Sequence, residues 1–144
     1  MTVAEDKQIT GTNSSGLLPL MLIYGAASLL HFAHNAVYLR DYPNLPQWLT
    51  STGVAAAWWV VALTGVFGYF LYSRVARLAG MLTIAVYALF GFGGLDHYAV
   101  APVTAHTTGM NLTILLEAGS SLALLICVAR LALLMTARRS QVPR

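Results

Sequence analysis

The sequence predicts an all-α integral membrane protein, a four-helix bundle that runs up-down-up-down with both termini in the cytoplasm. Of its 144 residues, 58% are hydrophobic and 9% are charged, whereas about a quarter of the residues of a typical soluble domain are charged. The mean hydropathy is +0.68. The apolar residues form four blocks of about 20 residues, each long enough to cross a ~30 Å hydrocarbon core as a helix.

The four blocks set the expected helix boundaries within one domain covering residues 16–137. Pro43 and Pro46 end the first helix, and the aromatic Tyr42 and Trp48 beside them are expected to lie at the headgroup level. Gly91, Gly93 and Gly94 make the last turns of the third helix easy to bend. In chain order, the expected helices cover residues 17–39, 53–72, 76–95 and 107–129.

The basic residues indicate the orientation of the chain in the membrane. The formal net charge is +3, but the basic side chains do not cluster on a soluble face, so no nucleic-acid partner is predicted. Arg74 and Arg77 lie between the second and third blocks, and four arginines follow the core of the fourth. By the positive-inside rule, the middle loop, a disordered tip at 1–15 and a basic tail at 138–144 are cytoplasmic. We expect the inner (plasma) membrane of a bacterium, with the lipid bilayer as the first partner.

Polar residues on the first helix share one face. Tyr24, Ser28, His31, His34, Asn35 and Tyr38 recur at spacings of three, four and seven residues, which places them on one stripe of an α-helix. Such groups are costly in lipid, so the stripe is expected to face the interior of the bundle.

The other expected helices supply matching polar groups. His106, Met110, Thr113 and Glu117 follow one another at helical spacing on the fourth helix, and eleven residues return to within about 20° of the same direction. Asp96 and His97 end the third helix on the same outer side of the membrane. All four histidines of the chain therefore gather in the outer half of the bundle.

This gathering predicts a transition-metal site. Imidazole nitrogens suit copper, iron and zinc, and two histidines at i and i+3 on one helix can reach a common ion. We expect copper or iron rather than zinc, with Asn35 and Tyr38 orienting the imidazoles by hydrogen bonds. The expected pool of metal ligands is His31, His34, His97, His106, Asp96 and Glu117.

Three alternatives stay open from the sequence. A b-type haem between His34 and His97, or between His31 and His106, fits a membrane bundle. A metal-free acid-base site with Glu117 as its catalytic group would act on a lipid-soluble substrate. The third alternative is an accessory or assembly subunit of a larger respiratory or oxygenase-type membrane complex, or a homo-oligomer, without its own cofactor. The all-apolar second helix suits such docking, and its Gly65 and Gly68 offer a close-packing surface.

Overall fold

The computed structural model describes residues 16–139, all of which lie in helices or in the turns between them. The described part contains four helices long and apolar enough to cross a membrane. This confirms the all-α class and the four apolar helices of a membrane protein. The predicted tip at 1–15 and residues 140–144 of the predicted tail lie outside the described residues.

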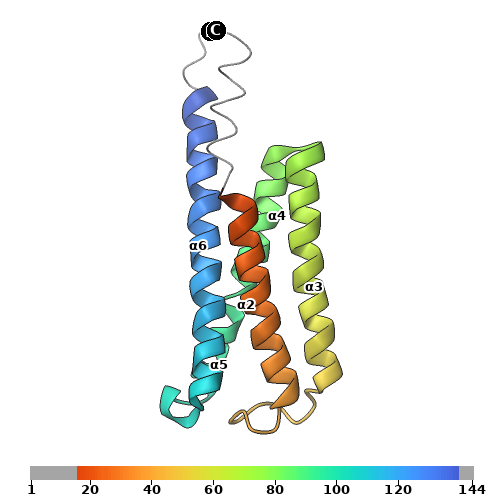
Figure 1. Cartoon of the computed structure of the whole chain (residues 1–144), viewed down its shortest axis with the longest axis vertical. Helices are drawn as coiled ribbons and strands as arrows, with labels where there is room; N and C mark the ends of the chain where they lie inside the picture. Colours follow the sequence, from red (N-terminus) through yellow and green to blue (C-terminus); the bar gives the residue numbers. More distant parts are fainter. Residues whose placement is uncertain (1–15, 140–144) are drawn as a thin grey trace.

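The long helices are joined by short helical turns (Figure 1). The third apolar block is divided at its glycines, as its composition predicts, and the last helix continues beyond the expected residue 129. In chain order, the elements are α2 (Leu17–Val37), α3 (Ser51–Phe70), the π-helical turn η1 (Leu71–Val75), α4 (Arg77–Phe90), the 3-10 turn η2 (Gly93–Leu95), α5 (Asp96–Val100), the 3-10 turn η3 (Val103–Ala105) and α6 (Thr108–Arg139).

The ends of the helices follow from local chemistry. Thr50 caps α3, because its Oγ1 accepts a hydrogen bond from the Gly53 amide at 3.1 Å and so satisfies one free N–H of the first turn. At the end of α4, a Cβ on Gly91 would lie 2.5 Å from the Ser121 Cβ. Glycine at this position therefore permits the close approach of α4 to α6.

The helices pack in a fixed order. In Figure 1, α2 and α4 lie between α6 on one side and α3 on the other, and the main contacts join α2 to α6 and α3, and α4 to α3 and α6. Cβ atoms added to Gly65 and Gly68 would lie 2.9 Å from Tyr87 and Ile84 of α4. The close-packing surface predicted on the second helix is therefore used within the chain.

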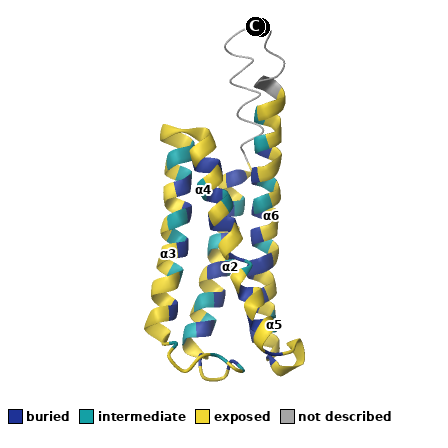
Figure 2. Cartoon of the chain, turned by 180° about the vertical axis from the view of Figure 1, so that it is seen from behind, coloured by how far each residue is buried: buried dark blue, intermediate teal, exposed yellow. Residues whose placement is uncertain are grey.

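The interior changes character along the bundle. Near the start of α2 and the second half of α6, the buried side chains are apolar, including Leu17, Met21, Leu124 and Val128. The buried polar side chains lie toward the other end, where α2 ends and α6 begins. Many large apolar residues on the outer helix faces are exposed (Figure 2), which is the arrangement that a surrounding lipid bilayer requires.

Candidate functional site

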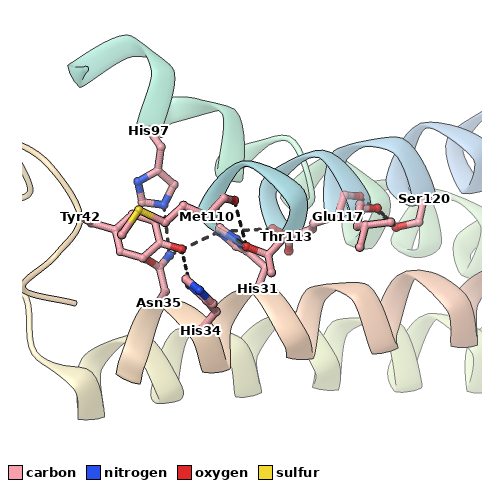
Figure 3. Close-up of polar contacts among 10 residues, drawn as sticks. His31, His34, Asn35, Tyr42, His97, Met110, Thr113, Glu117 and Ser120 are labelled. Atoms are coloured by element: carbon pink, nitrogen blue, oxygen red, sulfur yellow. Dashed lines mark hydrogen bonds and ion pairs between the residues drawn. The ribbon is translucent and has the colours of Figure 1, made fainter. Parts of the chain in front are cut away.

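Polar side chains from five segments meet at one end of the bundle, and Figure 3 shows most of them. The end of α2, the loop that follows it, α5, the turn between η3 and α6, and the start of α6 each contribute; His106, expected on the last helix, lies in that turn. All of these side chains are buried except His34, which is half-buried. We call the set the polar cluster: His31, His34, Asn35, Tyr42, His97, His106, Thr113 and Glu117.

Four residues of the polar cluster form an inner group, defined as His31, Asn35, His97 and Glu117. The Asn35 amide nitrogen donates to Nε2 of His31 at 3.3 Å and to Nε2 of His97 at 3.1 Å. His31 and Asn35 are adjacent on one face of α2 because they are four residues apart. Two imidazole nitrogens from different helices are thus directed at the same small volume.

The hydrogen bonds of Thr113 define the tautomer of His31. The Thr113 hydroxyl donates to the carbonyl oxygen of Met110 at 3.0 Å. Its oxygen is therefore left to accept from Nδ1 of His31, which lies 3.3 Å away. A neutral imidazole carries one proton, so Nε2 of His31 presents a lone pair to the inner group.

Glu117 brings a carboxyl group into the same volume. It is 1% exposed, and its Oε2 lies 3.7 Å from Nε2 of His31. Neither carboxyl oxygen has a hydrogen-bond partner among the described residues, although the Ser28 hydroxyl lies beside them. Gly94 of η2 covers this pair, and a Cβ on Gly94 would lie 3.1 Å from Oε2 and 3.5 Å from Nε2 of His31. The absence of a side chain at Gly94 keeps the space beside the pair open.

Three further residues form an outer group, defined as His34, Tyr42 and His106. The Tyr42 hydroxyl donates to Nδ1 of His34 at 2.9 Å, and the Tyr42 ring lies 4.7 Å from the ring of His97. Burial raises the pKa of the Tyr42 phenol, so at neutral pH the hydroxyl keeps the proton that it donates.

His106 closes the outer group next to Tyr42. Its Nδ1 donates to the Pro102 carbonyl oxygen at 3.0 Å, so Nε2 of the neutral ring carries the lone pair. That Nε2 is buried and has no hydrogen-bond partner among the described residues. The ring centroids of His106 and His97 are 6.1 Å apart, which brings all four histidines into one connected set.

Two residues predicted for the site lie outside the polar cluster. Asp96 is exposed, because adjacent residues of α5 point about 100° apart and His97 faces inward. Tyr38 is 47% exposed, and its ring touches only the outer side of the cluster, 4.6 Å from the His34 ring.

Two residues of the polar cluster were not predicted as site residues. Tyr42, which was expected at the headgroup level, is 4% exposed and folds into the bundle, whereas Trp48 is 79% exposed. Thr113 shares the predicted polar face of the last helix. The helical spacing of Thr113 could have identified it as a site residue, because a threonine on that face can hydrogen-bond an imidazole.

The polar cluster is not arranged as a finished metal site. Within residues 16–139, no group of three or more His, Cys, Asp or Glu side chains is already placed to hold a metal ion. Nε2 of His31 and Oε2 of Glu117 lie 3.7 Å apart, while the Asn35 amide hydrogen-bonds Nε2 of both His31 and His97.

Comparisons with protein-family models, with curated proteins and with solved structures gave no match for this chain. The site is therefore interpreted from its own geometry.

Proposed function

We propose that the protein binds a transition-metal ion through His31, His97 and Glu117 at the inner group. The observation that carries the proposal is the Glu117 carboxyl, which is 1% exposed and lies beside the Ser28 hydroxyl without a well-formed hydrogen bond on either oxygen among the described residues. It faces the lone pair of an imidazole at 3.7 Å.

The proposal follows from the cost of burying charge. An ionised carboxylate taken out of water without a partner costs several kcal/mol, and more within a lipid bilayer. A bound cation offsets this cost and also uses the lone pairs of the two imidazoles. Protonation of Glu117 would also avoid the cost of burying a charge, and a neutral Glu117 corresponds to the acid-base alternative.

The distance between His31 and Glu117 in the inner group is close to that between two ligands of a metal ion. Two ligands held 2.0–2.1 Å from an ion in tetrahedral geometry lie about 3.4 Å apart, and the His31–Glu117 pair is at 3.7 Å. The Asn35 amide nitrogen donates hydrogen bonds to both imidazole lone pairs. Its partially positive N–H groups thus occupy the place that a cation would take. Rotation of the Asn35 side chain away from this position would admit His97 as the third ligand.

The donor set supports an ion rather than a haem. Imidazole and carboxylate donors suit divalent copper, iron and zinc, of which copper binds most tightly in a given site. Between the proposed haem pair His34 and His97, the Tyr42 side chain contacts both imidazoles. His97 lies close to both members of the other proposed haem pair, with its ring centroid 5.5 Å from that of His31 and 6.1 Å from that of His106.

Metal analysis of the detergent-purified full chain tests the proposal. We expect the wild type to carry about one equivalent of copper, iron or zinc, and His31→Gln and Glu117→Gln to lose at least about 90% of it. Two matched controls, His34→Gln and Asp96→Asn, replace the same residue types at the same end of the bundle and should keep the metal.

Four outcomes contradict the metal proposal. If the wild type carries under about a tenth of an equivalent, or if His31→Gln and Glu117→Gln keep the metal, the inner group is not the site. An intense Soret absorption band would assign the histidines to haem instead. A metal-free chain that co-purifies with larger membrane proteins in mild detergent would favour the accessory-subunit alternative.

We further propose that the chain lies in a bacterial inner membrane, up-down-up-down, with both termini in the cytoplasm and the polar cluster toward the outside. The charge distribution supports this orientation. Labelling of intact cells with a membrane-impermeant maleimide tests it in a Cys127→Ala background. We expect Gln47→Cys, in the loop after α2, to be labelled and Ser73→Cys, in η1, to be protected; the reverse pattern would invert the orientation.

A further inference from the structure

An ion that reaches the inner group must enter from the loop end of the bundle. Toward the opposite end, the interior is closed by the buried apolar side chains of Leu17, Met21, Leu124 and Val128. A charged species crosses such a layer only at high cost. The loop end, in contrast, is lined by the imidazoles of His97 and His106 and by the phenol of Tyr42.

Tyr42 lies at this end of the bundle interior although it belongs to a connecting loop. Loop side chains normally lie at the surface, but Tyr42 is 4% exposed. Its ring covers His97 at a centroid distance of 4.7 Å and an interplanar angle of 36°. Its hydroxyl is fixed by the hydrogen bond to Nδ1 of His34. In Figure 3, the Tyr42 side chain extends from the loop and lies beside His97.

Asn44 holds the loop in this position. Its amide nitrogen donates to the Val100 carbonyl oxygen at 2.9 Å, which ties the loop to the end of α5. Asn44 is also the described non-glycine residue with positive φ, at 57°, a left-handed conformation that asparagine tolerates better than most residues. The Tyr42 side chain is therefore anchored at its hydroxyl, and its loop is anchored two residues later by the side chain of Asn44.

We infer that Tyr42 is the closing residue of the polar cluster, and that its side chain must swing out before an ion enters or leaves the inner group. The inference rests on the proposed metal site for its ligand, a divalent transition-metal ion. Tyr42 is not a metal ligand. It covers the inner group at the loop end, where it contacts the imidazoles of His34 and His97.

A closing residue affects rates differently from a ligand. Removing it lowers the barrier for entry and exit alike, so both rate constants rise while the dissociation constant changes little. For Tyr42→Ala we expect both rates of Co²⁺ exchange to rise about tenfold or more, the factor expected for losing a buried hydrogen bond with its ring contact. The dissociation constant should stay within about threefold, which is under 1 kcal/mol.

Three further variants divide the contributions. Tyr42→Phe keeps the ring over His97 and should show a smaller increase than Tyr42→Ala. Asn44→Gly keeps the left-handed backbone but loses the bond to Val100, so it should also accelerate exchange. Tyr38→Ala is the matched control, because it removes a tyrosine that touches His34 from the exposed side, and it should exchange Co²⁺ at the wild-type rate.

A second measurement needs no metal, so it tests the closing role of Tyr42 independently of the proposed metal site. Modification of His97 and His106 by diethyl pyrocarbonate, followed by mass spectrometry, should be faster in Tyr42→Ala than in the wild type and unchanged in Tyr38→Ala. Equal modification in Tyr42→Ala and the wild type would overturn the closing role, whether or not the chain binds metal. Faster modification in a chain without metal would keep the closing role and reject the ion.

Discussion

Replacing Gly80 with alanine is expected to prevent most of the chain from folding. A Cβ at this position would lie 2.2 Å from the backbone nitrogen and 2.3 Å from the Cα of Tyr72. Both atoms belong to the backbone of η1, so no rotation of a side chain can relieve the overlap. We expect a loss of at least about 3 kcal/mol, at or above the upper end of the range for an added methylene in a packed interior.

The measurement is the fraction of monodisperse protein after extraction, together with its thermal midpoint in detergent. Gly119→Ala is the matched control, since a Cβ there meets nothing within 4 Å and alanine suits a helix interior better than glycine. The control should be as stable as the wild type or more stable by up to about 1 kcal/mol. If Gly80→Ala and Gly119→Ala have the same midpoint, the close contact between η1 and α4 does not exist in the protein.

The membrane-spanning helices were predictable because their signal is local. Blocks of about 20 apolar residues are specified by the thickness of the hydrocarbon core, whatever the helices pack against. The glycines near residues 91–94 likewise predicted the division between α4 and α5, because a run of glycines weakens a helix by itself. The exposed apolar faces of the helices follow from the same lipid surroundings.

The polar stripes were predictable for a second reason, the fixed period of a helix. Spacings of three, four and seven residues placed His31 and Asn35 on one face of α2, and the structure joins them by a hydrogen bond. Thr113 and Glu117 share the facing stripe of α6, and both approach His31. Periodicity therefore identified the walls of the polar cluster, although it could not say which nitrogen faces which oxygen.

Residues in turns and loops follow no such period. Tyr42 lies in a loop whose path depends on the tie between Asn44 and Val100, a contact across 56 residues that no local pattern reveals. Tyr38 lies beyond the last residue of α2, where the helical period no longer applies. The exposure of Asp96 depends on where α5 begins, which the glycines before it did not define. The position of the Asn35 amide between two imidazoles could not be predicted, because it depends on the orientations of the Asn35, His31 and His97 side chains together.

Replacing Gly94, which lies beside the His31–Glu117 pair, is expected to weaken metal binding strongly. A Cβ there would stand 3.1 Å from the Glu117 Oε2 and 3.5 Å from Nε2 of His31, so it would occupy volume that the two proposed ligands share. We expect Gly94→Ala to weaken metal binding about tenfold and Gly94→Val about a hundredfold, the range seen when the surroundings of metal ligands are altered. Competition with a chelator of known affinity measures the change.

Gly93 supplies the matched control from the same 3-10 turn, because a Cβ at Gly93 meets nothing within 4 Å. Neither glycine has a positive φ, so alanine is compatible with the backbone at both positions and the two variants differ only in what the new methyl group meets. Gly93→Ala should bind metal as the wild type does. Equal affinities for Gly93→Ala and Gly94→Ala would mean that the ion does not lie between His31 and Glu117. A selective loss in Gly94→Ala would locate it there, because the atoms nearest to the added methyl group belong to the proposed ligands.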